Sequence, residues 1–155
     1  MATVTAAIET NIFQRKRMFN KLIDLLDNNL EGKVIAVLGL AFKQETDDVR
    51  ESPAIEIIAS IHDKGGIIKA YDPIANDSMK EIFPELDYKS NWPEAVEGCD
   101  AVVIMTEWNE FRSLDLEKLK NLMSQPVILD TRNILSVSEL KRLEFKFDNV
   151  GRRVA

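Results

Sequence analysis

From Lys33 onward, short apolar runs alternate with stretches in which apolar positions recur at helical spacing. The apolar runs predict buried strands over residues 34–40, 67–73, 101–108 and 126–133. The amphipathic stretches predict helices over residues 53–65, 92–98, 115–123 and 136–145. A weaker strand is expected near residues 87–88, and the tail can add an edge strand. The alternation predicts an α/β protein with a three-layer, Rossmann-like, mainly parallel and doubly wound sheet.

A long N-terminal helix is predicted before the first strand. In residues 4–28, apolar side chains recur near helical spacing, with Arg15, Lys16 and Arg17 between them, and the turn-prone run DNNLEGK follows. Such a helix is unusual in a free-standing α/β domain. It could be a connector from an upstream part or an oligomerisation element, and the residues alone leave both interpretations open.

Length and composition place the chain among ordinary soluble proteins. Its 155 residues suit a single fold with a real core, and 45% of them are hydrophobic and 30% charged. The net charge of −6 disfavours nucleic acid as a partner, although a small anion needs only two or three local cations. No apolar run approaches the roughly 20 residues that span a bilayer, and the N-terminus does not resemble a signal peptide. We therefore expect a cytoplasmic protein without a membrane partner.

Three of the predicted strands are followed by loops that carry unusual side chains. Ligands of parallel sheets bind beyond the carboxyl ends of the strands, where the strand order reverses. The loops at residues 39–43, 106–108 and 130–133 all lie at that edge, and the order 3-2-1-4-5 makes their strands neighbours. Lys43 and Arg132 would then converge on one crevice that suits an anion with a planar group, such as a nucleotide diphosphate. The alternative is that both are solvated surface residues.

The dinucleotide-binding fingerprint is absent. The first strand is followed by a single Gly39 and then by Leu40, Ala41 and Phe42, where G-x-G-x-x-G needs two more glycines. Their bulk would keep a pyrophosphate away from the backbone. Asp72 stands where the ribose-binding acid of that motif would be, but with Pro73 after it a turn role is the better interpretation.

No catalytic or metal constellation is visible. The acids within residues 45–48 precede a helix whose N-terminus favours negative charge, with Ser52 as its cap, which explains them better than a metal site does. His62 has no second histidine or cysteine to join it. Cys99 has no basic partner nearby, and as the single cysteine it excludes an internal disulfide. The residues therefore predict a binding protein with no catalytic group and no metal.

Four stretches nevertheless resemble a known family. The runs VLGLAFKQETDDVRESPA, AYDP, VVIMTEWNEF and ILDTRN, in this order and spacing, resemble the C-terminal UDP-binding domain of the UDP-glucose 6-dehydrogenases, in the UDP-glucose/GDP-mannose dehydrogenase family. The resemblance extends from about Ile8 to Arg152. The Thr-Glu-Trp run favours the UDP-glucose branch over the GDP-mannose and UDP-N-acetylmannosamine branches.

The resemblance implies a domain organisation and a role. Residues 1–30 would be the end of the helix that connects the two halves of these enzymes and builds their dimer, so a homo-oligomer is expected. Residues 31–155 would be the UDP-sugar-binding, Rossmann-like domain. The whole enzyme oxidises UDP-glucose to UDP-glucuronate, a precursor for polysaccharide biosynthesis, in two steps that reduce NAD held mainly by another domain.

Site residues carry over one by one. The family's Phe-Lys pair falls on Phe42 and Lys43, and the arginine of its D-x-R motif falls on Arg132; all three would contact the UDP-sugar. The arginine of T-D-D-x-R falls on Arg50, which would contact the NAD.

The chain also departs from the family. Nothing in it matches the NAD-binding Rossmann domain or the catalytic cysteine motif, and Cys99 lies in the wrong domain. An isolated C-terminal domain that is inactive alone is therefore expected. Two rival interpretations stay open: the same domain from a GDP-mannose or UDP-N-acetylmannosamine dehydrogenase, and a non-catalytic binding or assembly module.

Overall fold

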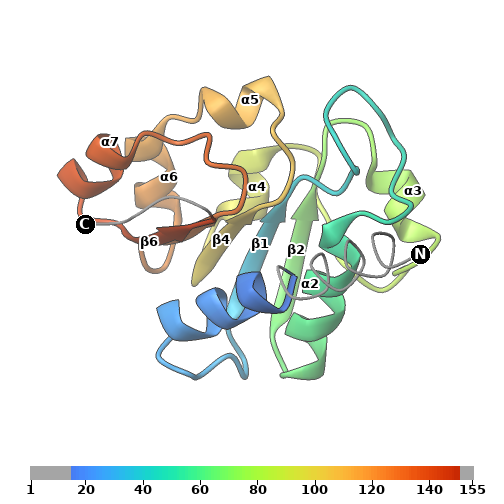
Figure 1. Ribbon diagram of the computed structural model, residues 1–155, viewed down its shortest axis with the longest axis horizontal. Coiled ribbons are helices and arrows are strands. Elements are labelled where there is room, and N and C mark those ends of the chain that lie inside the picture. The colour runs from blue at the N-terminus through green and yellow to red at the C-terminus, as the bar shows by residue number, and fades with distance from the viewer. Residues whose placement is uncertain (1–14, 151–155) are drawn as a thin grey trace, which may run out of the picture.

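A computed structural model describes residues 15–150, in which six strands form one parallel sheet (Figure 1). The strand order is β3-β2-β1-β4-β5-β6, and every neighbouring pair is parallel. The strands are β1 (Val34–Leu38), β2 (Ile67–Tyr71), β3 (Asp87–Tyr88), β4 (Ala101–Ile104), β5 (Val127–Asp130) and β6 (Lys146–Asn149). The predicted Rossmann-like sheet is confirmed, including the weak third strand and the added edge strand.

Helices cover both faces of this sheet. Residues 15–25 are helical, and the later helices are α2 (Pro53–Asp63), α3 (Asn76–Lys80), α4 (Trp92–Val96), α5 (Asn109–Arg112), α6 (Leu116–Leu122) and α7 (Val137–Arg142). Residues 15–25, α2 and α3 contribute to one core cluster, and α4 to α7 contribute to the other. Strand residues alternate between the two: Ile35 and Val37 belong to the first cluster, and Ala36 and Leu38 belong to the second.

Local chemistry sets where the helices begin. Ser52 accepts a hydrogen bond from the backbone N–H of Ala54 at the start of α2, with Pro53 at the first helical position. The predicted cap of this helix is therefore confirmed. The side chains of Asn91, Asp115 and Ser136 cap α4, α6 and α7 in the same way.

Several predicted bounds need correction. The strands are shorter than predicted at their carboxyl ends, because the chain leaves the sheet there to form loops; β1, for example, ends at Leu38 rather than at residue 40. The N-terminal helix ends at residue 25 rather than at 28, where Asp27 and Asn28 have positive φ angles of 56° and 61°. Its predicted part before residue 15 lies outside the described residues. Helices α3 and α5 were not predicted, because five and four residues are too few to show a helical period.

Within residues 15–150, no helix combines the length and the apolar character that crossing a membrane requires.

Candidate functional site at the carboxyl ends of the strands

The three loops that were expected to form the ligand site do share one edge of the sheet. Because β4 pairs with β1 on one side and with β5 on the other, the loops that follow these strands leave the sheet side by side. In Figure 1 the arrowheads of β1 and β2 point toward the top of the view, where the loop after β1 projects beyond the sheet. The predicted adjacency of the strands that carry these loops is therefore confirmed.

The loop after β1 leaves the sheet through a close contact with the loop after β4. Gly39 has a φ of 95°, and a Cβ added there would lie 2.6 Å from the backbone nitrogen and side chain of Thr106. The Thr106 hydroxyl donates a hydrogen bond of 2.8 Å to the carbonyl of Ala41. A glycine is needed at this position for the backbone angle and for the close approach. Its function here is therefore to join two loops, since no pyrophosphate-binding glycines follow it.

Asp72, directly after β2, fastens the same loop. Its carboxylate is 2% exposed and accepts five hydrogen bonds of 2.8 to 3.1 Å. The donors are the backbone N–H groups of Leu40, Ala41, Ile74 and Ala75 and the indole N–H of Trp108. The expected turn role of Asp72 is confirmed by its bond to Ile74. The bonds to residues 40, 41 and 108 were not predicted, because they depend on tertiary structure.

Beyond this anchor, the loop after β1 exposes the residues that the resemblance assigned to the UDP-sugar. The Phe42 side chain is 48% exposed although it is large and apolar, and Lys43 is also exposed. The backbone N–H of Phe42 donates to the carbonyl of Asp48 at 2.7 Å, which closes the loop. An aromatic ring and an ammonium group are thereby presented to the surroundings from a braced backbone.

Arg50 lies at the far end of this loop and faces solvent. Its side chain is 88% exposed and forms a two-pronged ion pair with Asp48, with both N–O distances 3.1 Å. Hydrogen bonds from Arg50 hold the pKa of Asp48 below its ordinary value, and the same pair raises the pKa of Arg50. Arg50, Phe42, Asp48 and Glu51 line a shallow hollow of about 330 Å³. The predicted NAD-contacting arginine is therefore accessible.

Arg132 projects from the loop after β5. Asp130 is 2% exposed and accepts hydrogen bonds from the backbone N–H groups of Arg132, Ile134 and Leu135. These bonds fix the backbone from which the Arg132 side chain extends. The guanidinium is 34% exposed and forms an ion pair with Glu107 in the loop after β4.

Glu107 is a site residue that the sequence did not reveal. Its side chain is 20% exposed, and it is a carboxylate at an edge that was expected to attract anions. Glu107 lies in the Thr-Glu-Trp run, which is the signal that could have drawn attention to it. That Glu107 faces Arg132 follows only from the pairing of β4 with β5. The structure thus joins Arg132 to the loop after β4, whereas Lys43 is exposed on the loop after β1.

Neither Cys99 nor His62 is placed for a catalytic or metal-binding role. Cys99 is fully buried and its thiol donates to the carbonyl of Ala95 at 3.0 Å. Burial raises the pKa of the Cys99 thiol to about 12, so the thiolate needed for nucleophilic attack does not form near neutral pH. His62 is exposed on α2, and no group of three or more metal-ligating side chains occurs in the part of the chain that the structure describes.

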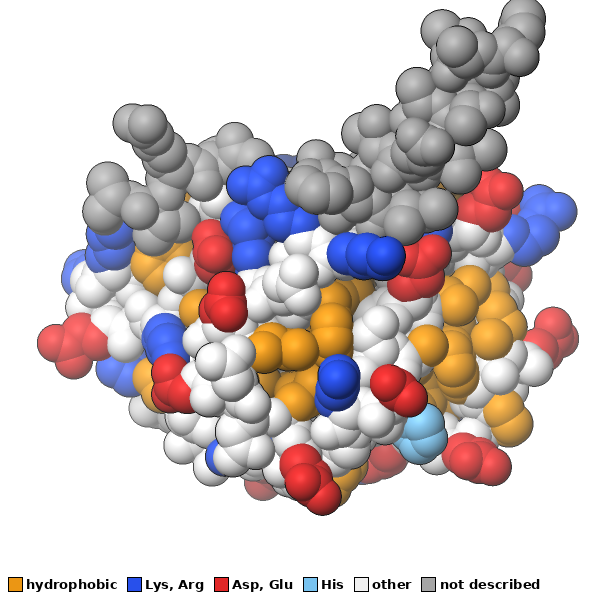
Figure 2. Space-filling model, turned by 60° about the horizontal axis from the view of Figure 1, so that its bottom comes forward, with side chains coloured by type: hydrophobic (Ala, Val, Ile, Leu, Met, Phe, Trp, Pro, Cys, Tyr) orange, Lys and Arg blue, Asp and Glu red, His pale blue; other side chains and the backbone are white. Residues whose placement is uncertain are grey.

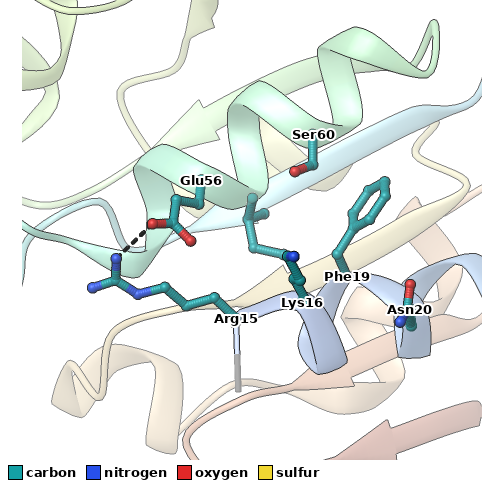
Figure 3. Close-up of a pocket in the computed structure, with 7 residues that line it drawn as sticks. Arg15, Lys16, Phe19, Asn20, Glu56 and Ser60 are labelled. Carbon is teal, nitrogen blue, oxygen red and sulfur yellow. Dashed lines mark hydrogen bonds and ion pairs between the residues drawn. The ribbon is translucent and has the colours of Figure 1, made fainter. Parts of the chain in front are cut away.

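Hollows also occur away from the carboxyl edge. A small one of about 150 Å³ lies between residues 15–25 and α2, where Arg15 forms a 2.7 Å ion pair with Glu56 (Figure 3). It is too small for a nucleotide, since ligand sites usually exceed about 300 Å³. A larger, mainly apolar hollow of about 530 Å³ lies at the amino ends of β2 and β3, and Figure 2 shows hydrophobic side chains gathered beside the histidine. The acids Glu85 and Asp87 line it, which disfavours a diphosphate there.

Comparisons with known proteins identify the family of this chain. Residues 36–137 match the model of the UDP-glucose/GDP-mannose dehydrogenase family, UDP binding domain. The chain is 42% identical over 151 residues to a UDP-glucose 6-dehydrogenase of Rickettsia bellii, covering 96% of this chain and 35% of that protein. It is 40% identical over 150 residues to UDP-glucose 6-dehydrogenase TuaD of Bacillus subtilis, covering 96% of this chain and 32% of that protein.

Solved structures show the same likeness. A dehydrogenase for NDP-N-acetyl-D-galactosaminuronic acid from Methanosarcina mazei superposes with a TM-score of 0.86 at 25% identity, covering 96% of this chain and 31% of that one. A UDP-glucose dehydrogenase from Pyrobaculum islandicum superposes with a TM-score of 0.76 at 27% identity, covering 86% of this chain and 29% of that one. The chain spans about a third of the curated relatives named here. It belongs to the UDP-glucose/GDP-mannose dehydrogenase family and matches that family's UDP binding domain.

Proposed function

We propose that this chain is the nucleotide-sugar-binding part of an NAD-dependent UDP-glucose 6-dehydrogenase. The observation that carries the proposal is the family match over residues 36–137, which contains all three loops of the carboxyl edge. Relatives at 42% and 40% identity are UDP-glucose 6-dehydrogenases, which favours that branch over the others. In this proposal residues 1–30 are the end of a connecting helix and residues 31–155 are the binding domain.

The binding chemistry follows from the exposed groups of the two loops. The diphosphate carries negative charge, so the ammonium of Lys43 and the guanidinium of Arg132 are its natural partners, through charge-assisted hydrogen bonds. The exposed ring of Phe42 offers an apolar surface next to Lys43 for the planar base or the sugar. The strands β1 and β5 are separated by β4 alone, so one extended nucleotide sugar would bridge the loops that follow them.

NAD fits the ordinary dinucleotide position of this chain poorly. The carboxylate that would hold its ribose is Asp72, whose two oxygens already accept five hydrogen bonds from protein groups. We therefore propose that NAD is held by a part of the enzyme outside this chain and is contacted here by Arg50 alone. When bound, NAD supplies hydride acceptance, and the chain's own task is to bind and orient the nucleotide sugar.

Three further features belong to the same proposal. The isolated chain is inactive, because its single cysteine is a buried thiol whose pKa is raised by burial. The whole enzyme is a cytoplasmic homo-oligomer that associates through the N-terminal helix. NADH production from UDP-glucose by this chain alone would contradict the first of these statements.

Calorimetric titration of Lys43→Ala tests the proposed site. We expect wild-type chain to bind UDP and UDP-glucose with similar affinity and more tightly than GDP or NAD. Removing the ammonium should weaken UDP binding about 10- to 100-fold, the range that follows from losing one charge-assisted hydrogen bond. Lys64→Ala is the matched control, since this exposed lysine follows α2 at the opposite edge of the sheet.

The outcomes separate the alternatives. Tighter binding of GDP than of UDP would favour the GDP-mannose branch. No binding of any nucleotide, with a solution mass that changes when the apolar stripe at Phe19 is broken, would favour the assembly module instead.

A further inference from the structure

We propose that Asp72 is the positioning residue that sets the loop after β1 for nucleotide binding. This inference rests on the proposed function, because it concerns the geometry of the same site. Asp72 does not touch the ligand in this account; it acts through the residues whose N–H groups it binds.

The hydrogen bonds of Asp72 show that its role is internal. An ionised carboxylate offers about four lone-pair sites, and five protein donors already surround this one. The side chain is 2% exposed, so neither water nor a ligand hydroxyl has access to it. Burying a carboxylate costs free energy unless its oxygens accept hydrogen bonds. The five contacts of Asp72 therefore depend on one another.

The same bonds reach the residues that the proposed site uses. The donors at Leu40 and Ala41 are the two backbone groups that immediately precede Phe42 and Lys43. The third long-range donor, the indole of Trp108, is adjacent in sequence to Glu107, the partner of Arg132. One carboxylate after β2 therefore holds the loop of Lys43 and the loop that orients Arg132.

Two other aspartates show why Asp72 is distinctive. Asp130 is the last residue of β5, and the bonds that its carboxylate accepts come from residues 132 to 135 of its own loop. Asp100 also joins distant segments, accepting from the backbone N–H of Val34 at 2.8 Å and from the Gln125 side chain at 3.1 Å. It does so before β4, at the opposite edge of the sheet, which makes it a matched control.

Asp72→Asn is the informative change, with Asp100→Asn beside it. Both replace a cross-linking carboxylate with a group of the same shape, and in both the new NH₂ cannot accept a hydrogen bond. We expect both variants to be less stable than wild type. Only Asp72→Asn should weaken UDP binding by the folded protein, by about tenfold or more, whereas Asp100→Asn should stay within about twofold.

Hydrogen exchange supplies a readout that needs no ligand. In Asp72→Asn, amides of residues 40–48 should exchange faster relative to the rest of the sheet, while Asp100→Asn should leave them unchanged. If Asp72→Asn does not fold, Trp108→Phe removes one donor and keeps the carboxylate. We then expect UDP binding about threefold weaker, with Trp92→Phe, at the first residue of α4, as its control.

The results decide the inference in either direction. A folded Asp72→Asn that binds UDP like wild type, or whose loop exchanges at the wild-type rate, overturns it; if that variant cannot be folded, equal binding by Trp108→Phe and wild type does the same. Failure of wild-type chain to bind UDP is a different result, because it removes the proposed function and the nucleotide part of the inference together. The exchange measurement then still decides whether Asp72 holds the loop.

Discussion

The two edges of the sheet present different kinds of side chain. At the carboxyl edge, polar loops expose Lys43 and Arg132 above buried carboxylates that brace the backbone. At the amino edge, a hollow of about 530 Å³ is lined mainly by apolar side chains, with Ile67 53% exposed. Size and apolar lining alone would select the amino edge as the ligand site. The negative charge of the nucleotide diphosphate that we propose as ligand favours the carboxyl edge instead, because the exposed cations Lys43 and Arg132 lie there.

The largest effect is expected at the contact that joins the loops of β1 and β4. Gly39→Ala places a Cβ 2.6 Å from Thr106 at a φ of 95°, so steric overlap adds to backbone strain. We expect a loss of about 3 kcal/mol or more in the free energy of unfolding, measured by urea titration.

Gly98→Ala is the control for this prediction. Gly98 also has a positive φ, of 72°, but an added Cβ meets nothing within 4 Å. Gly98→Ala should therefore lower the free energy of unfolding by about 1 kcal/mol, from backbone strain alone. Equal losses in the two variants would show that the contact with Thr106 relaxes and does not brace the carboxyl edge.

The features of the carboxyl edge that the sequence predicts are those that leave a pattern in neighbouring residues. The alternation of apolar runs and amphipathic stretches was enough for the sheet, because each buried strand carries its own pattern. Lys43 and Arg132 could be placed at one edge because all parallel strands end there. The partnership of Glu107 with Arg132 is different, since residues 25 positions apart meet only through the pairing of β4 and β5. The bonds of Asp72 to residues 40, 41 and 108 escaped prediction for the same reason.

The next largest effect concerns ligand affinity. Arg132→Ala should weaken UDP binding about 10- to 100-fold, because a charge-assisted contact to the diphosphate is lost and Glu107 is left unpaired at the site. Stability should change far less. Arg142→Ala is the control: Arg142 also pairs with a carboxylate, that of Glu139 at 2.7 Å, but on the surface of α7. If calorimetry gives both variants the wild-type affinity, Arg132 is a solvated surface residue.

A smaller effect on the free energy of unfolding is expected at high pH, from a tyrosine that is hydrogen-bonded to a residue of the amino-edge hollow. Burial raises the pKa of Tyr88 from 10.0 to about 12, and its hydroxyl donates to the carbonyl of Phe83, which lines the hollow. The folded state therefore retains this proton when the unfolded state loses it. The contribution is complete below pH 10 and is lost as the pH rises from 10 to about 12.

Comparing wild type with Tyr88→Phe isolates that contribution from the other groups that titrate there. The wild type should lose about 1 kcal/mol more than the variant between pH 9.5 and 11.5, a linkage value reduced for partial exposure. Parallel pH profiles of unfolding would place the tyrosine hydroxyl in contact with water in the folded state.

The smallest effect is expected in the amino-edge hollow, where a null result is informative. Ile67→Thr keeps a β-branched residue at the start of β2 and reduces the apolar surface of a side chain that is already 53% exposed. Because such surface changes usually stay within about 0.5 kcal/mol, stability should hardly change, and UDP affinity should remain within about twofold. If Ile67→Thr weakened UDP binding as Lys43→Ala is expected to, the nucleotide would be bound at the apolar edge, and the charges at the carboxyl edge would need another explanation.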